Sequence, residues 1–406
     1  MLLHWIWFSK LKKLSDGAKR QLLQHFSDPE EIYNSEAERL LRLEGVTEAV
    51  VDALEDKDLT GAKKILEYCT RQNIGILPLD AADYPARLRN TCDPPLLLYF
   101  RGTLPQWDAQ PVVAIVGTRK ATPYGLTVAG QFGGQIAASG GLVISGAAGG
   151  IDTAAMDAAL RTGQPVVGVL GCGLDHVYPR FNQELYARVT RQGCLLTEYE
   201  PDVLPQSWHF PARNRIITGI SNALLVVEAP EKSGAMISAR LALEQGRDVF
   251  AVPGNVGVPA CAGSNALLQD RAMPALCGWD VMRDYEPLWP DVVKRREVVQ
   301  RPQVAMPQNP LYTSVSAADR QEKPENTRKK DIDKEDKSTY SVLDKPMPEL
   351  SEEEKTVLSL IGKTPIGIDD LIAGTGMRSG AVKAILTRLC LKRLTVNHAG
   401  GRVSLK

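Results

Sequence analysis

The 406-residue chain has no excess of charge of either sign. Its 48 lysine and arginine residues balance its 48 aspartate and glutamate residues, so the formal net charge is zero. A global basic attraction to nucleic acid is therefore absent, and any binding of a polyanion has to come from basic side chains clustered locally.

The chain also lacks a cysteine framework. Its seven cysteines are dispersed, no two of them form a CxxC pair, and no set of His and Cys has zinc-ligand spacing. We therefore expect no metal site and no disulfides, and expect buried thiols in a reducing compartment instead. The N-terminus has too short an apolar run for a signal peptide, and the uncharged stretch 121–151 is too rich in glycine for a membrane helix. These features predict a cytoplasmic protein without a membrane segment.

A nucleotide-cofactor signature is missing as well. No GxxxxGK[ST] phosphate loop occurs, and the one run that begins like GxGxxG, GCGLDHVYP, has His176 where the last glycine would stand. We therefore expect no dinucleotide cofactor. We interpret His176 and His209 as packed or hydrogen-bonded side chains and not as catalytic bases, and we expect no catalytic residue.

Hydrophobic periodicity divides the chain into four segments. Residues 1–75 carry short helical patterns, which suit either a helix-hairpin-helix or sterile-alpha-motif-like module or a small helical cap on the next domain. Residues 291–348 lose nearly all large apolar side chains and are highly charged around 319–337, which predicts a disordered linker. Residues 349–406 predict a winged helix-turn-helix, with a capping box from Ser351 to Glu354 and two C-terminal strands.

Residues 76–290 have a different sequence pattern, in which apolar β-branched runs alternate with Gly-rich turns and amphipathic stretches. Such nearly continuous apolar strands are typical of a parallel sheet covered on both faces, so we predict an extended Rossmann-like, doubly wound, mostly parallel α/β domain. The runs are VVAIVG (112–117), LVISG (142–146), PVVGVLG (165–171), CLLTEY (194–199), ALLVVEA (223–229) and DVFAVPG (248–254).

Ligands of such sheets bind beyond the carboxyl ends of the strands. After the first run come Gly117, Thr118, Arg119 and Lys120, which offer close backbone approach, a hydroxyl and cations that can grip a phosphate. After the second run come glycines whose amides can face an anion, and Asp152, which we interpret as the N-cap of the next helix.

The segment HFPARNR carries the strongest signal for nucleic acid. Arg213 and Arg215 flank Asn214 and follow Phe210, and arginines next to an exposed aromatic ring provide phosphate contacts and a face for base stacking. Lys232 lies where a cation can reach a passing backbone. We predict that these residues bind a single DNA strand together with the turn at 117–120.

At these motifs the sequence closely resembles the DNA-processing protein A family, also called DprA or Smf. The resemblance runs in order through VAIVGTRKATPYG, ISGAAGGIDTAAMDAAL, GVLGCGLDHVYP, HFPARNRIITGIS and LLVVEAPEKSGAMISARLALEQGR. It implies a single-stranded-DNA-binding Rossmann domain, a homodimer, and loading of the RecA recombinase onto DNA during natural transformation. Two positions depart from the family pattern: Met156 replaces a common histidine, and Arg271 replaces a glycine.

Two other functions stay open at this stage. One is a nucleotide-processing enzyme of the N-glycoside hydrolase type, although the PGGxGT-type loop of those proteins does not occur here. The other is a transcriptional regulator that acts through the winged module, whose candidate recognition helix carries Lys383, Arg388, Lys392 and Arg393.

Overall fold

The protein is described by a computed structural model that divides into two compact units, residues 1–308 and 309–406. Most of the predicted charged linker and all four basic side chains of the candidate recognition helix lie outside the described residues. The described residues are 1–296, 351–362, 364, 366–377, 382, 385, 386, 389, 395–398 and 402–405.

The centre of the first unit is a nine-stranded sheet of order β1-β2-β6-β5-β4-β3-β7-β8-β9. The strands from β6 to β9 in this order are parallel, while β1 and β2 pair antiparallel at one edge. The predicted mostly parallel sheet is thus confirmed. The strands are β1 (Gly75–Pro78), β2 (Leu97–Gly102), β3 (Val112–Val116), β4 (Leu142–Ser145), β5 (Val166–Val169), β6 (Cys194–Thr197), β7 (Ala223–Val226), β8 (Asp248–Ala251) and β9 (Met273–Pro274).

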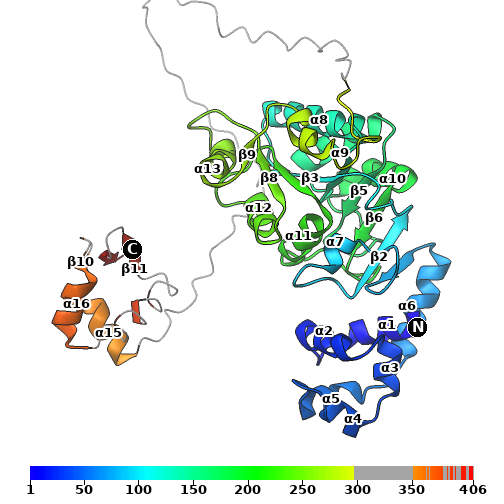
Figure 1. Cartoon of the computed structure of the whole chain (residues 1–406), viewed down its shortest axis with the longest axis horizontal. Coiled ribbons are helices and arrows are strands. Elements are labelled where there is room, and N and C mark those ends of the chain that lie inside the picture. The colour runs from blue at the N-terminus through cyan, green and yellow to red at the C-terminus, as the bar shows by residue number, and fades with distance from the viewer. Residues whose placement is uncertain are drawn as a thin grey trace, which may run out of the picture. The chain divides into compact units, whose positions relative to one another are not determined.

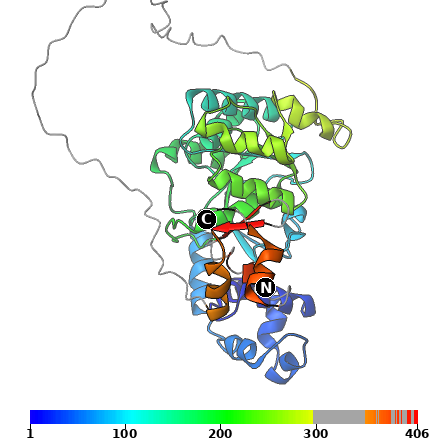
Figure 2. The same cartoon turned by 90° about the vertical axis from the view of Figure 1, so that its left-hand side faces the viewer.

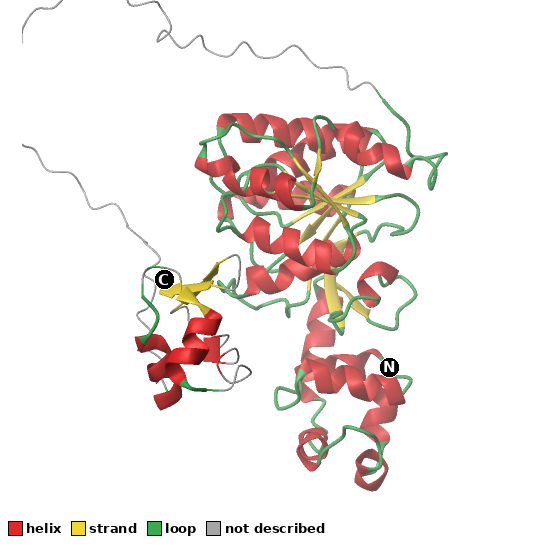
Figure 3. Cartoon of the chain, turned by 60° about the vertical axis from the view of Figure 1, so that its left-hand side comes forward, coloured by secondary structure: helices red, strands yellow, loops and turns green. Residues whose placement is uncertain are grey.

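Helices cover both faces of this sheet, because side chains of each central strand alternate between two hydrophobic layers (Figure 3). Val113 and Ile115 of β3 belong to the layer under α8, α9, α10 and α14, whereas Val112 and Ala114 face α7, α11, α12 and α13. The helices are α7 (Ala86–Arg89), α8 (Pro123–Ala138), α9 (Ile151–Arg161), α10 (Gln183–Gln192), α11 (His209–Ile220), α12 (Gly234–Glu244), α13 (Ala262–Asp270) and α14 (Gly278–Met282), with 3-10 turns at Arg180–Asn182, Pro259–Cys261 and Arg283–Tyr285.

The strand order reverses between β3 and β7, which are neighbours in the sheet but far apart in the chain. The chain proceeds from β3 through β4, β5 and β6 on one side and then returns to β7 on the other side. In a doubly wound sheet such a reversal leaves a crevice beyond the carboxyl ends of the two strands. The loops that follow β3 and β7 therefore border the position where a ligand is expected.

The N-terminal helices pack together beside β2 (Figures 1 and 2). Their apolar residues, among them Trp5, Phe8 and Leu54, form one core that also contains Leu96 and Leu97 next to and within β2. The helical segment thus shares a core with the sheet domain. Its helices are α1 (Leu2–Lys10), α2 (Asp16–His25), α3 (Pro29–Asn34), α4 (Ala37–Leu41), α5 (Glu48–Leu54) and α6 (Thr60–Arg71).

The second unit has its own small core, which contains Val357, Leu371 and Val403. Its three-stranded sheet has the order β10-β12-β11, and β11 and β12 form the predicted antiparallel pair. The predicted capping box is confirmed, since Ser351 and Glu354 exchange side-chain and backbone hydrogen bonds. The elements are α15 (Glu352–Ser359), β10 (Ile366–Gly367), α16 (Ile368–Thr375), β11 (Thr395–His398) and β12 (Arg402–Leu405).

Every described cysteine is a free thiol. Cys69, Cys172, Cys194 and Cys261 are buried as expected, whereas Cys92 is exposed. None of the helices in the described ranges combines the length and the apolar character that a bilayer crossing requires.

Candidate functional site

The loop after β3 is wedged between two neighbouring segments. A Cβ atom on Gly117 would lie 2.5 Å from Cγ1 of Ile151 and 2.8 Å from the main-chain oxygen of Glu228, so only glycine fits there. The Thr118 N–H donates to the Glu228 oxygen at 2.7 Å, and the Ile151 N–H donates to the Thr118 oxygen at 3.4 Å. The loop is therefore fixed against the end of β7 and the start of α9.

The Glu228 carboxylate fixes the same loop through hydrogen bonds. It is 1% exposed and accepts hydrogen bonds from the main-chain N–H of Thr122 at 3.0 Å and from the Thr122 hydroxyl at 2.6 Å. The same hydroxyl accepts from the Gly125 N–H at 3.0 Å and caps α8. Both carboxylate oxygens are thus engaged with the loop, an arrangement that suits positioning and not proton transfer.

Arg119 and Phe210 meet at the rim of the sheet. The exposed Arg119 places its Cζ atom 4.8 Å from the centroid of the Phe210 ring, within cation–π distance. Phe210 is half-buried, and its ring rests on Gly171, where a Cβ would lie 2.8 Å from Cδ1. The expected meeting of a guanidinium and an aromatic ring from distant segments is therefore present for this pair.

Arg213 does not reach the rim. It is 4% exposed, and its guanidinium donates to the main-chain oxygen of Gly146 at 2.8 Å and to that of Val169. The prediction that its guanidinium lies at the surface is wrong, because the side chain points inward and ties the ends of β4 and β5 to α11. Desolvation by burial lowers the pKa of Arg213, and the nearby Asp152 opposes that shift.

Asp152 lies beside the Arg213 guanidinium, since both would contact a Cβ atom placed on Gly146. Its interpretation as an N-cap is wrong by two positions. The N-cap of α9 is Gly150, and Asp152 accepts the N–H of Ala148 at 3.3 Å from within the first turn. Burial raises the pKa of Asp152 to about 6, and the Arg213 charge acts in the opposite direction.

Arg215 is also engaged by other side chains and does not join the pair of Arg119 and Phe210. Its Nη2 atom is 2.6 Å and 2.7 Å from the two carboxylate oxygens of Glu198, and its Nε atom is 3.1 Å from Asp93. Asn214 is buried, with its Oδ1 accepting from Arg213 and its Nδ2 donating to the Gly234 oxygen at 3.4 Å. Their expected exposure for DNA contact is not observed, because both side chains join α11 to its neighbours.

Lys120 and Lys232 are both exposed, on the loops that follow β3 and β7. They therefore border the crevice left by the reversal of strand order. Sequence reasoning placed these cations correctly at loop positions after the strands.

The contacts of His176 and His209 agree with the prediction that both are packed or hydrogen-bonded side chains. His176 Nε2 lies 2.9 Å from the Asp202 main-chain oxygen, and His209 Nδ1 lies 3.2 Å from that of Gly171. The His209 ring also stacks on Tyr199 at 3.9 Å between centroids. Sequence reasoning missed Tyr178, whose ring centroid is 5.1 Å from that of Phe210. An aromatic residue in the turn after β5 was the available signal.

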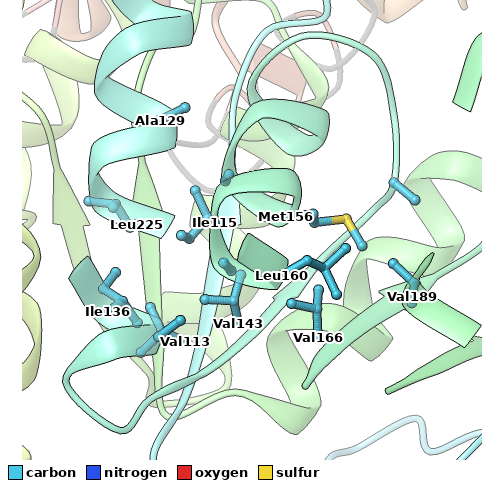
Figure 4. Packing of buried hydrophobic residues seen from close by; sticks show 14 of the residues in the cluster. Val113, Ile115, Ala129, Ile136, Val143, Met156, Leu160, Val166, Val189 and Leu225 are labelled. Carbon is cyan, nitrogen blue, oxygen red and sulfur yellow. The ribbon is translucent and has the colours of Figure 1, made fainter. Parts of the chain in front are cut away.

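The two departures from the family pattern have different surroundings. Met156 is completely buried, and its side chain lies among Val143, Leu160 and Val166 in the hydrophobic layer of α9 (Figure 4). A polar role at this position is therefore absent. Arg271 is exposed at the C-cap of α13. Within the described residues, no group of three or more His, Cys, Asp or Glu side chains is placed to hold a metal ion.

Comparison with family models matches two parts of the chain. Residues 75–286 match the model described as DNA recombination-mediator protein A, and residues 343–401 match the model described as DprA winged helix domain. The first match contains every candidate residue described above, from Gly117 to Lys232.

Individual relatives extend these matches. DNA processing protein DprA of Bacillus subtilis is 37% identical over 221 residues, which cover 54% of this chain and 74% of that protein. Protein Smf of Synechocystis is 29% identical over 405 residues, which cover 98% of this chain and 97% of that one. The X-ray structure of DprA from Streptococcus pneumoniae has 30% identity and a TM-score of 0.61, and covers 70% of this chain and 98% of that chain.

Proposed function

The chain belongs to the DNA recombination-mediator protein A family, and from that premise we propose that it binds single-stranded DNA at the crevice between β3 and β7. Family membership makes it a DNA-processing and recombination protein. The geometry of the rim supports a single strand as its ligand, since a ring can stack on a base only where the base is unpaired and accessible.

The observation that carries this proposal is Arg119 over the Phe210 ring at 4.8 Å. A guanidinium can bind a phosphate in a bidentate manner while the neighbouring ring accepts a base, so the pair suits one nucleotide of a chain. The loop that presents Arg119 is held by Gly117, Thr118 and the Glu228 carboxylate. Such a rigid loop loses little conformational freedom when DNA binds.

The remaining predicted residues take two roles in this proposal. Lys120 and Lys232 are exposed beside the crevice and supply further phosphate contacts. Arg213, Asn214 and Arg215 act as positioning residues, because their hydrogen bonds fix α11 and therefore the Phe210 ring.

The proposal is one of binding without catalysis. The Glu228 carboxylate, an acid at the crevice, is engaged by Thr122. Incubating the protein with nucleoside monophosphates tests the alternative, since an N-glycoside hydrolase would release free base.

Loading of RecA by a homodimer during natural transformation is the finer part of the proposal and is supported by family membership alone. A strand-exchange assay with RecA and single-stranded DNA that is already covered by a single-strand-binding protein tests it.

Fluorescence anisotropy with single-stranded and duplex oligonucleotides at two ionic strengths tests the site. We expect tighter binding of the single strand. We also expect Arg119→Ala to weaken binding of all sequences alike and to flatten the log–log salt slope by about 0.7, because one phosphate contact is lost. Arg161→Ala is the control, since Arg161 is 67% exposed in the last turn of α9, at the opposite edge of the sheet. Parent-like affinity and slope for Arg119→Ala would refute the assignment.

A further inference from the structure

Phe181 is a highly exposed aromatic side chain that the site described above does not use. It is 74% exposed, more than Trp208 at 66% or Tyr178 at 39%. It lies in the 3-10 turn Arg180–Asn182, just before α10. An exposed phenyl ring contributes little burial to the fold, so its conformation and surroundings decide whether it has another role.

The tip of the ring lies against a glycine in the loop after β4. A Cβ atom on Gly149 would lie 2.9 Å from Cζ of Phe181, so the loop backbone and the ring are in close contact only because residue 149 has no side chain. The edge of the ring at Cζ thus meets the loop backbone, while the side chain stays largely accessible to solvent.

The residue after Phe181 anchors it to the same loop. Asn182 is 2% exposed, and its Nδ2 atom donates to the Ala147 main-chain oxygen at 2.9 Å and lies 2.9 Å from the Thr153 hydroxyl. Ala147 is itself in the left-handed region, with φ of 51°, which is unfavourable for a residue with a side chain. The Phe181 turn and the loop are therefore held in one fixed geometry.

The loop that contacts Phe181 also packs against the loop of the proposed DNA site. A Cβ atom on Gly150 would lie 2.4 Å from the Thr118 oxygen and 2.7 Å from the Arg119 oxygen, so the two loops pack backbone to backbone. Arg119 in turn covers Phe210. A contiguous run of contacts thus links the two rings. Arg180, exposed beside Phe181, adds a second pairing of a cation with an aromatic residue.

We propose that Phe181 is a second base-stacking position of the DNA site, which takes an unpaired base further along the strand that lies over Arg119 and Phe210. This inference rests on the proposed function and extends it. Phosphate-binding cations that alternate with stacking rings are the arrangement by which proteins follow a single strand without reading its sequence. A longer strand therefore occupies both rings, while a short one occupies only the first.

Anisotropy titrations with oligo-dT of increasing length test this inference. We expect Phe181→Ala to bind the shortest oligonucleotides like the parent and long ones roughly tenfold more weakly. Phe181→Trp retains the flat face and is expected to keep the affinity for long strands, whereas Phe181→Leu, which is apolar but not flat, is expected to lose it. Leu288→Ala is a matched control, because Leu288 is also highly exposed, at 67%. It precedes Trp289, whose ring N–H donates to the main-chain oxygen of Asp108 just before β3, so it lies near the amino end of that strand and not at the carboxyl end.

A double-mutant cycle with Gly149→Ala tests the seat of the ring. The added methyl group displaces the ring without removing it, so we expect Gly149→Ala alone to weaken the binding of long strands. In the Phe181→Ala background the same change is expected to have no further effect. An equal effect in both backgrounds would mean that the loop acts independently of the ring and would overturn the proposal.

The outcomes for the two sites are distinguishable. Parent-like binding of every length by Phe181→Ala, or full retention by Phe181→Leu, overturns the second stacking position and leaves the first site intact. Parent-like binding of short oligonucleotides by Phe210→Ala and Arg119→Ala overturns the DNA site itself, and with it the premise of this inference.

Discussion

Two arginines that were both predicted to contact DNA have opposite environments in this protein. Arg119 is exposed over an aromatic ring, whereas Arg213 is buried and donates to main-chain oxygens at the ends of two strands. A buried guanidinium with satisfied donors fixes a structure, while an exposed one is available to a ligand. Residue type alone therefore does not separate the two roles.

Asp152 provides a pH-dependent test of the buried cluster around Arg213. Its pKa is raised from 3.8 to about 6 by burial, so the folded protein binds more protons than the unfolded chain between about pH 4 and pH 6. Its contribution to stability is full below pH 4 and is lost as the pH rises through 6, by up to about 3 kcal/mol. The free energy of unfolding of the parent, relative to Asp152→Asn, is therefore expected to fall across this window.

Chemical denaturation of both proteins at several pH values measures this difference. Other titrating groups are common to the two proteins, so their contributions cancel in the difference. Parallel pH profiles for the parent and Asp152→Asn would contradict the predicted burial of an ionisable carboxyl group at this position.

The pairing of Arg119 with Phe210 was predictable from sequence, whereas the surface positions predicted for Arg213 and Arg215 are wrong. Residues advance by about 100° around a helix, so positions 213 and 215 of α11 cannot share a face, and 215 points well away from 210. That argument was available from spacing alone. The inward direction of Arg213 was not, because it depends on carbonyl groups at the ends of β4 and β5.

At the scale of elements, the apolar runs located β3 to β8 because buried parallel strands are apolar on both faces. The pattern did not locate the edge strands β1 and β9 or the antiparallel strand β2. β1 has four residues including a proline, β9 has two, and β2 carries Arg101, which donates to the distant Leu174 oxygen. Their pairing depends on long-range contacts that a local pattern does not contain.

Thr122 connects the Arg119 loop to α8, and its substitution tests that connection. Thr122→Ala removes both the cap to Gly125 and the hydrogen bond to buried Glu228, so we expect a loss of about 2 kcal/mol in the free energy of unfolding and weaker binding of single-stranded DNA. Thr122→Ser keeps the hydroxyl and is expected to behave like the parent in denaturation and anisotropy. A serine variant as unstable as the alanine variant would assign the effect to the methyl group instead.

At the scale of the whole first unit, charged pairs join the N-terminal helices to the sheet domain. Lys10 of α1 lies 2.7 Å from Glu200, and Arg20 of α2 pairs with Asp93. Asp93 also pairs with Arg215, which bonds to Glu198 after β6. One network thus spans α2, the segment before β2, the end of β6 and α11. Desolvation by burial raises the pKa of Glu198, and the Arg215 charge opposes it.

Removing one partner from this network is expected to destabilise more than removing two. Arg215→Met leaves the half-buried Glu198 without its counter-charge and is expected to lower the free energy of unfolding by about 2 kcal/mol. Adding Glu198→Gln is expected to recover part of that loss, because the uncompensated charge is removed. Denaturation of the single and double variants measures both effects, and strictly additive losses would argue against coupling between the two side chains.

Both outermost strands of the nine-stranded sheet contain a proline: Pro78 in β1 and Pro274 in β9. Proline has no main-chain N–H, so neither border offers a complete ladder to an incoming strand. Accidental merging of two molecules into one continuous sheet is thereby disfavoured. Two copies that associate through the first unit are then expected to do so through side chains, so single surface substitutions are expected to separate them.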